Sequence, residues 1–503
     1  MSFKKITPMK SLALPTVPFL LILASCSGLE DSIPAFDQYN YVSTMTGIPP
    51  EMAVTGDRYN EIVENPFMKV AEQPVSTFSI DADGASYSNT RRFIRENYKP
   101  PADAVRTEEL INYFPLDYPV NNTGHPVSLN GEIAACPWAE GHKLIRIGIS
   151  GKDIPSAQLP PANFVLLIDV SGSMSSPDKL DLLKEGFMNL VDEFSANDQI
   201  AIVTYAGSAG VVLESTSGSE KGKIKSAITS LGSGGSTAGA AGIVKAYEIA
   251  RQHYIEEGHN RVILGTDGDF NVGVSDQEEL VELIETHRDT GIFLTILGVG
   301  RGNLNDGALE QIANKGNGNY EYIDQIEQAN KVFIHEYNKF FTVAKDVKVQ
   351  VEFNPDLVDS YRLIGYENRL LEEDDFEDDS EDAGEIGAGQ TITALYEIIP
   401  RSQPDARYLP AFTIKFRYKN PEENTSNPLS LDIYDEGKAF LSASNSMVFT
   451  ASVAGFGMLL RDSQYKGSLS YGKLLEWTSG TLGFDPHGYR EEFRTLIQRA
   501  RNL

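Results

Sequence analysis

Cysteine is scarce in this chain, with two among 503 residues, Cys26 and Cys136. Cys26 closes a segment with the pattern of a processing signal, so the mature chain is expected to keep one thiol. That excludes an intramolecular disulfide, a Cys-x-x-Cys redox pair and a Cys-rich zinc site. The seven histidines are scattered and form no His-Glu-x-x-His spacing, so the ligands of a zinc hydrolase are missing. The Gly-x-x-x-x-Gly-Lys-Ser/Thr motif of nucleotide hydrolysis is also absent, and we expect no nucleotide.

Positive charge is also in short supply. Lys and Arg total 43 against 71 Asp and Glu, a formal net charge of −28, which repels phosphate backbones and predicts no nucleic-acid partner. Hydrophobic residues make up 41% and charged residues 23%, an ordinary globular profile. At roughly 100–200 residues per domain, the length predicts two to four domains.

Long apolar runs are missing after the first 25 residues, and the run that is there suits a targeting signal. Lys4, Lys5 and Lys10 precede an apolar stretch from Leu12 to Ala24, which is shorter than the roughly 20 residues of a membrane-spanning helix. The stretch is typical of a secretory signal peptide and ends in Leu-Ala-Ser-Cys, which resembles a bacterial lipobox. We predict a lipoprotein signal peptide over residues 1–25 and lipidation of Cys26; the alternative is an ordinary signal peptide with an incidental cysteine.

This reading predicts a lipid-anchored protein of the bacterial cell envelope, whose soluble part is periplasmic or surface-exposed. Ser27 follows the lipidated cysteine, and the lack of an aspartate there favours the outer membrane over the inner membrane. Residues 26–74 are polar, contain several prolines and show no sustained periodicity, so we expect a tether.

The remainder divides by pattern into three stretches. Residues 75–150 mix strand and helix signals, residues 161–340 alternate strands with helices, and residues 344–503 contain strands followed by helices. Within the middle stretch, Phe164–Ile168 is a continuous apolar run, as expected of a parallel strand buried on both faces. The pattern predicts an α/β fold with a doubly wound parallel sheet, flanked by an N-terminal extension and by a C-terminal β-rich and helical region.

The segment from Glu372 to Asp382 is strongly acidic, with nine acidic residues in eleven. We interpret it as a solvated, mobile loop, because nothing in its sequence enforces the ligand geometry of a calcium site.

Three unusual sequences fall at the carboxyl ends of predicted strands, where ligands gather in a doubly wound sheet. They are Asp169-Val-Ser171-Gly-Ser173, Gly234-Gly-Ser-Thr237 and Thr266-Asp267-Gly-Asp. Their carboxylate and hydroxyl oxygens suit a hard divalent cation, with Mg²⁺ favoured over an all-protein calcium cage. Each fragment alone could merely cap a helix or form a turn, but all three at matching strand ends favour a metal site.

This set resembles the metal-ion-dependent adhesion site of von Willebrand factor type A domains, which have a Rossmann-like fold. The resemblance implies that Ser171 and Ser173 contact the ion, that Thr237 joins them, and that Asp169 and Asp267 act directly or through water. It further implies that an acidic side chain of a partner protein completes the coordination. Mg²⁺ is the expected ion, with Mn²⁺ or Ca²⁺ as alternatives.

The flanks extend the resemblance to one bacterial group. Three segments resemble the flanking regions of YfbK-like von Willebrand A proteins. FSIDADGASYSNTRRFI and AVRTEELINYFPLDYP precede the central stretch, and GYENRLL follows it.

Three functions compete. The first is a non-enzymatic, metal-dependent protein-binding module, for adhesion or scaffolding, tethered to an envelope membrane. The second is a metal-assisted hydrolase, which would need a base or nucleophile beside the ion, although no histidine neighbours the three motifs. The third is a structural envelope scaffold in which the metal stabilises the fold. The sequence favours the first.

Overall fold

The computed structural model describes residues 56–80, 83–119, 124–235, 239–268, 277–381, 383–401 and 408–503, all within one unit, Pro49–Leu503. The predicted signal peptide and Cys26 lie outside these residues, so the lipoprotein assignment stays a prediction. No helix in the described ranges is long and apolar enough to cross a membrane.

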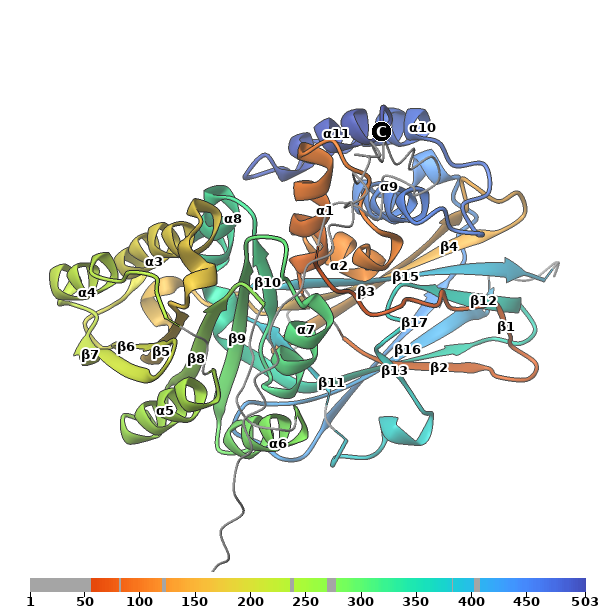
Figure 1. The fold of residues 1–503 in the computed structure, drawn as a ribbon. Helices are drawn as coiled ribbons and strands as arrows, with labels where there is room; N and C mark the ends of the chain where they lie inside the picture. Colours follow the sequence, from red (N-terminus) through yellow and green to blue (C-terminus); the bar gives the residue numbers. More distant parts are fainter. Residues whose placement is uncertain are drawn as a thin grey trace, which may run out of the picture. The chain divides into compact units, whose positions relative to one another are not determined.

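The middle of the chain forms a six-stranded sheet in the order β10-β9-β8-β5-β6-β7 (Figure 1). All side chains of the central strand β5 are buried, as the apolar run predicts. The strands are β5 Ala162–Asp169, β6 Gln199–Tyr205, β7 Ala209–Ser217, β8 His259–Thr266, β9 Ile292–Val299 and β10 Tyr320–Ile323. Every pairing is parallel except that of β7 with β6. The predicted doubly wound sheet is therefore confirmed, with an antiparallel edge strand that the sequence analysis did not anticipate.

Helices cover both faces of this sheet because β5 sends alternate side chains to two separate cores. Phe164, Leu166 and Ile168 pack with α3, α4 and α8, whereas Val165 and Leu167 pack with α5, α6 and α7. The helices are α3 Leu182–Glu193, α4 Lys221–Thr229, α5 Gly239–Gln252, α6 Gln277–Arg288, α7 Asp306–Lys315 and α8 Ile326–Asn330. Figure 1 shows α3, α4 and α8 above the sheet and α5 and α6 below it.

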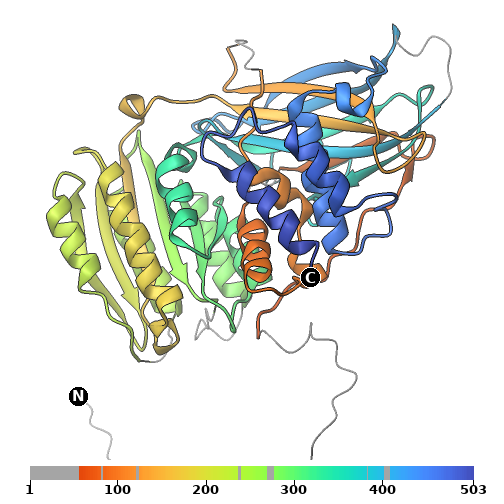
Figure 2. The same ribbon diagram turned by 90° about the horizontal axis from the view of Figure 1, so that it is seen from above.

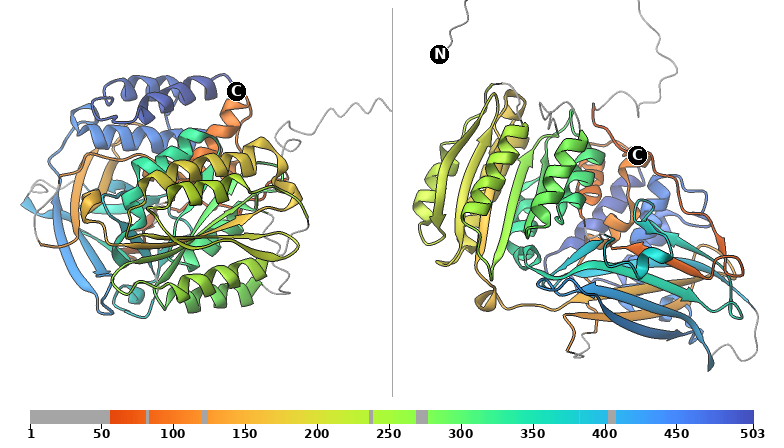
Figure 3. Two further views of the ribbon diagram at one scale, coloured as in Figure 1. Left: turned by 90° about the vertical axis from the view of Figure 1, so that its left-hand side faces the viewer. Right: turned by 90° about the horizontal axis from the view of Figure 1, so that it is seen from below.

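The two flanks build one β-sandwich together. One sheet has the order β1-β12-β15-β4-β3 and the other β13-β2-β11-β16-β17, with β14 added to β11. The N-terminal strands are β1 Met68–Lys69, β2 Val75–Ser79, β3 Val127–Ala135 and β4 Lys143–Gly151. The C-terminal strands are β11 Thr342–Phe353, β12 Val358–Ile364, β13 Leu370–Leu371, β14 Gly384–Gly387, β15 Thr391–Pro400, β16 Pro410–Lys419 and β17 Asn427–Tyr434. Each sheet therefore contains strands from both flanks, which are far apart in the sequence (Figure 3).

A layer of five described helices covers the outer face of the sheet β1-β12-β15-β4-β3, with α2 and α9 packed directly against β15 (Figure 2). They are α1 Ala85–Arg95, α2 Thr107–Asn112, α9 Asn445–Leu460, α10 Tyr471–Ser479 and α11 Tyr489–Ala500. Their apolar residues share a core with Leu144, Ile364 and Leu395 of the sheet, while the opposite side chains of the same strands fill the space between the two sheets. The sheet is therefore buried on both sides.

The expected tether, residues 26–74, is corrected by the structure from Gly56 onward. Val70 is fully buried and donates its N–H to the carbonyl of Asp359 at 3.0 Å. Met68 pairs with Tyr361 through β1. These contacts are mostly main-chain hydrogen bonds to distant strands, which require no hydrophobic periodicity. The sequence pattern therefore did not indicate them.

The acidic segment is also corrected, because it is anchored to the sandwich. Phe376 is buried, and the Lys348 ammonium donates to the carbonyls of Asp375, at 2.9 Å, and Asp378. Lys419 donates to the carbonyl of Asp379 at 2.7 Å. Cations on β11 and β16 thus offset the acidic charge, which the segment's own sequence does not reveal. Asp382 lies outside the described residues.

Candidate functional site

The first element of the candidate site is Asp169, the last residue of β5. Its side chain is fully buried, and its Oδ1 accepts the N–H of Ser171 at 2.8 Å. Its Oδ2 accepts hydrogen bonds from the hydroxyls of Tyr205, at 3.2 Å, and Thr266, at 3.3 Å. Three neighbouring strands therefore hold this carboxylate in one orientation at the carboxyl edge of the sheet.

Two serine hydroxyls lie next to it. The Oγ atoms of Ser171 and Ser173 are 2.9 Å apart, which is close enough for both to reach one ion. The glycine-rich loop is drawn against this turn, because Gly172 donates its N–H to the carbonyl of Gly235 at 3.1 Å and Gly234 donates to Val170 at 2.7 Å. Thr237, predicted to join the serines, is outside the described residues.

The second carboxylate, Asp267, follows β8 directly and is also fully buried. A hydrogen bond joins its side chain to Ser173, so the β5 and β8 loops meet. Its Oδ2 accepts from the ammonium of Lys179 at 2.9 Å, and the same ammonium donates to Oδ1 of Asn303 at 3.1 Å. The structure thus brings together Asp169, Ser171, Ser173 and Asp267, four of the five residues that the sequence predicts.

The two carboxylates differ in proton affinity. Burial raises the pKa of Asp169 above its usual value; hydrogen bonds from Ser171 and Tyr205 oppose this, while the charge of Asp267 adds to it. Burial also acts to raise the pKa of Asp267, but the hydrogen bonds of Lys179 and Asn303 outweigh it and hold that pKa below its usual value. Asp267 is therefore the more firmly ionised of the pair.

The donor set fits a hard divalent cation. All its candidate ligands are carboxylate or hydroxyl oxygens, and Mg²⁺ commonly keeps several waters beside one or two carboxylates. Among the described residues, no group of three or more His, Cys, Asp or Glu side chains is placed to hold a metal. Such an ion would therefore depend on the two serine hydroxyls as well as the two acids. That these residues bind a metal stays a prediction.

Lys179 and Asn303 were not predicted from the sequence. Lys179 stands six residues after Ser173, and nothing local shows that its ammonium meets a carboxylate 88 positions away. Asn303 lies in the loop after β9, next to glycines that indicate a turn and nothing more. A non-local contact of this kind has no sequence signal of its own.

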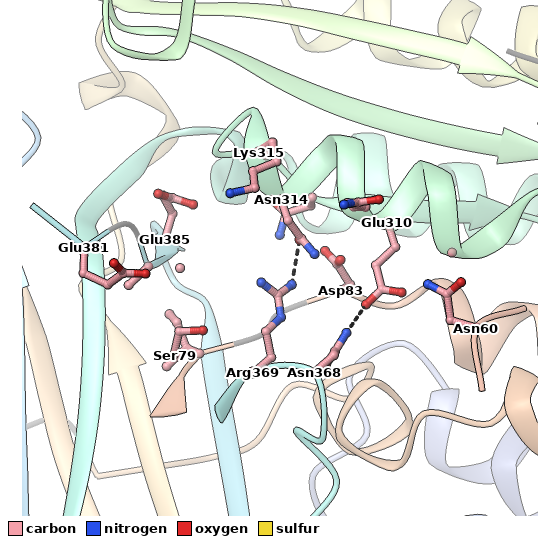
Figure 4. Close-up of a pocket in the computed structure, with 17 residues that line it drawn as sticks. Asn60, Ser79, Asp83, Glu310, Asn314, Lys315, Asn368, Arg369, Glu381 and Glu385 are labelled. Carbon is pink, nitrogen blue, oxygen red and sulfur yellow. Dashed lines mark hydrogen bonds between the residues drawn. The ribbon is translucent and has the colours of Figure 1, made fainter. Parts of the chain in front are cut away.

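A polar cavity of about 400 Å³ lies elsewhere, beside α7, and none of the four site residues lines it (Figure 4). Asn368 donates to Glu310 at 2.5 Å and Arg369 donates to Asn314 at 2.6 Å across one side of it. These bonds link the C-terminal region to α7. The cavity therefore lies between α7 and the C-terminal region that carries Asn368 and Arg369, and acidic and amide side chains line much of it.

The doubly wound sheet, with its acidic and serine-bearing loops at the carboxyl edge, defines a von Willebrand factor type A domain. The family model of that description matches residues 163–334. Two others match the flanks: "von Willebrand factor" over residues 53–146 and "Uncharacterized protein YfbK, C-terminal" over residues 338–503. Such a domain indicates a protein-interaction or adhesion module.

Similarity to one curated protein extends over nearly the whole chain. A protein of Escherichia coli strain K12, described as "Uncharacterized protein YfbK", is 41% identical over 467 residues, which cover 88% of this chain and 81% of that protein. The chain belongs to the YfbK family of von Willebrand factor type A proteins.

More distant similarities cover parts of the chain. "Uncharacterized protein sll0103" of Synechocystis is 26% identical over 199 residues, 40% of this chain and 45% of that protein. A solved structure, "von Willebrand factor type A from Catenulispora acidiphila", is 15% identical, covers 75% of this chain and 91% of that chain, and has a TM-score of 0.41.

Proposed function

We propose that this protein is a membrane-tethered, divalent-metal-dependent protein-binding module of the bacterial envelope. The observation that carries the proposal is the convergence of Asp169, Ser171, Ser173 and Asp267 at one edge of the sheet. Two buried carboxylates lie there beside two hydroxyls whose oxygens are 2.9 Å apart. Mg²⁺ is the proposed ion, with Mn²⁺ or Ca²⁺ as substitutes.

Partner binding would use an exposed acidic side chain. A divalent cation held largely by neutral hydroxyls and water keeps much of its positive charge, so an incoming carboxylate can complete its coordination. The contact gains strength as the interface excludes water, because the effective dielectric constant falls. The module would therefore need a metal and an anionic ligand together.

A binding role fits the site better than catalysis does. A metal-assisted hydrolase needs a positioned base or nucleophile beside the ion. The hydrogen bonds described at this site join Asp169 and Asp267 to Ser171, Tyr205, Thr266 and Lys179, and Lys179 to Asn303, and none of them involves a histidine. Ser171 and Ser173 would be occupied as ligands.

Capture of partners from envelope extracts tests the proposal. Wild-type protein and Asp169→Ala are compared with Mg²⁺ and with EDTA, and Mn²⁺ binding of both is measured by titration calorimetry. We expect the wild type to bind Mn²⁺ and to retain a defined partner only with metal, and Asp169→Ala to lose both. Metal-independent capture would favour the scaffold alternative. Hydrolysis of a generic ester that survives repurification and is lost in Asp169→Ala would favour the hydrolase.

The tether is tested separately through Cys26. Cys26→Ser should move the protein from the membrane fraction to the soluble fraction, because one lipidated cysteine would be the attachment. Cys136→Ser is the matched control: burial raises the pKa of the Cys136 thiol to about 12, so that side chain is a poor candidate for modification. Unchanged membrane fractionation of Cys26→Ser would contradict the lipoprotein assignment.

A further inference from the structure

The side chain of Lys179 lies inside the candidate metal site. The residue is 7% exposed, and its Nζ lies 2.9 Å from Oδ2 of Asp267 and 3.1 Å from Oδ1 of Asn303. The carboxylate it contacts is fully buried. A buried ion pair with an additional amide acceptor fixes the direction of the ammonium and leaves little freedom to the side chain.

The loop that follows β9 leaves space for the aliphatic stem of Lys179. Gly300, which follows β9, has a φ of +70°, and a Cβ added to it would lie 2.3 Å from Cε of Lys179. The aliphatic stem therefore runs where any other residue at position 300 would put its side chain. On the opposite side of the pair, a Cβ at Gly268 would come within 2.6 Å of the N–H nitrogen of Asn305. The two loops that carry Asp267 and Asn303 are packed directly against each other.

The formal charges of the site follow from this placement. Asp169 and Asp267 contribute two negative charges and Lys179 one positive charge, so the protein offers a net charge of −1 to an ion. A divalent cation would raise the total to +1. Without Lys179 the two carboxylates would balance the formal charge of the same ion, and the loaded site would attract an anion only through the local field of the ion.

We infer that Lys179 is a resident counter-cation that weakens metal binding and leaves the metal-loaded site with a positive charge that an anionic ligand must balance. The inference rests on the proposed function and deepens it. The positive charge of Lys179 lowers the affinity of the site for the ion, because two cations repel each other at short range. The same charge stabilises the buried Asp267 when no ion is bound, and it makes the loaded site favour carboxylate ligands.

The inference is tested by Mn²⁺ titration of the whole chain. Lys179→Met and Lys179→Gln remove the charge and keep most of the stem. Lys184→Met is the matched control, since Lys184 stands five residues further on and its ammonium donates to the carbonyls of Thr229 and Leu231 and contacts no acid of the site. We expect both position-179 variants to bind Mn²⁺ at least about tenfold more tightly than the wild type, as unit charges this close interact strongly in a buried setting. Lys184→Met should match the wild type.

Acetate provides the second measurement. Added to Mn²⁺-loaded protein and followed by water-proton relaxation, it should displace metal-bound water in the wild type and do so at least several-fold less readily in Lys179→Met. The melting temperature without metal should fall in this variant, and Mn²⁺ should raise it by more than in the wild type. Adding Asp267→Asn to Lys179→Met should recover much of the metal-free stability, because the carboxylate that lost its cation no longer carries a charge.

The outcomes separate this inference from the proposed function. A wild type that binds no Mn²⁺ removes the basis of both. A wild type that binds Mn²⁺, with position-179 variants that bind it equally or more weakly, overturns the role of Lys179 alone. Tighter Mn²⁺ binding with unchanged acetate binding overturns the anion selectivity. If Lys179→Met fails to fold, Lys179→Gln and the double variant with Asp267→Asn decide the same questions.

Discussion

Arg91 and Asp324 form an ion pair that is sealed from solvent, with Nη2 2.5 Å from Oδ1 and side-chain exposures of 1% and 4%. Arg91 belongs to α1 of the N-terminal flank, and Asp324 directly follows β10 of the central sheet. The same guanidinium donates to Glu492 of α11 at 3.0 Å and to Gln328 of α8 at 2.9 Å. One side chain therefore joins the N-terminal flank, the von Willebrand A domain and the C-terminal helices.

Arg91→Met should lower the free energy of unfolding by about 3–5 kcal/mol, because it leaves Asp324 buried without its cation. Urea denaturation at neutral pH measures the change. Arg494→Met is the control, since Arg494 forms a more exposed pair with Glu491 on α11 and should cost about 1 kcal/mol or less. Equal effects of the two variants would mean that the Arg91 network contributes little to stability.

Lys348→Met should loosen the acidic segment, because its ammonium holds the carbonyls of Asp375 and Asp378. We expect faster cleavage of native protein after Glu377 or Glu381 by a glutamate-specific protease, followed by mass spectrometry. Lys415→Met serves as the comparison, as Lys415 pairs with Glu352 in an exposed bridge on the neighbouring strand. A segment that is cut equally fast in the wild type would be mobile after all.

Glu321→Gln should flatten the pH dependence of stability. Burial raises the pKa of Glu321 from 4.5 to about 7, against the opposing charge of Lys331. A carboxyl with a raised folded-state pKa contributes stability that is fully present at acidic pH and is lost as pH rises from about 4.5 to about 7. The wild type should therefore lose at most about 3 kcal/mol across this window on account of Glu321, and the glutamine variant should keep it. Thermal unfolding from pH 4.5 to 8 measures this.

Glu282→Gln on the exposed side of α6 is the control for that experiment and should follow the wild-type curve. Lys331, Glu336 and Lys339, which surround Glu321, are unchanged in both variants. A glutamine variant as pH-sensitive as the wild type would show that Glu321 is ionised in the fold at neutral pH.

Gly300→Ala should disturb the candidate metal site through Lys179. The new methyl would collide with Cε of Lys179, and a positive φ adds strain of about 1–3 kcal/mol. Gly302→Ala is a matched control, because Gly302 has a φ of +90° and its Cβ would meet no atom within 4 Å. We expect both variants to lose stability, whereas Mn²⁺ affinity should change in Gly300→Ala alone. An equal change in both would point to backbone strain in the loop.

Local pattern predicted the central domain well, because its main features are local. The apolar run of β5 shows burial on both faces, and Asp169 stands where that run ends. Strand β7 was missed: its side chains are mostly half-buried or exposed, and strand direction is set by pairing with β6.

Features that depend on distant contacts were not predictable in this way. The interleaving of both flanks in two sheets arises from pairings such as β4 with β15, whose residues stand some 250 positions apart. Lys179 meets Asp267, and the acidic segment meets Lys348 and Lys419, through contacts that no window of sequence contains. The charges were visible in the sequence, but their partners were not.

Two residues of the stretch first predicted as a tether, Asp57 and Arg58, are bonded to the loop beside the candidate metal site. Oδ1 of Asp57 accepts the N–H of Gly302 at 2.7 Å and of Leu304 at 3.2 Å, and Arg58 donates its N–H to the carbonyl of Leu304 at 2.8 Å. Asn303, which holds Lys179, lies between the two donors.

In a lipid-anchored protein that grips a partner through its metal, mechanical load would run between the membrane and the ion. It would enter the described fold around Asp57, which is bonded to the loop of Asn303 and, through Oδ2, to Arg92 of α1 at 2.8 Å; part of the load would thus reach Asp267 through Asn303 and Lys179. Tension on the anchor would therefore act on the residues that hold the ion, so the lifetime of the bond to a partner would depend on that tension.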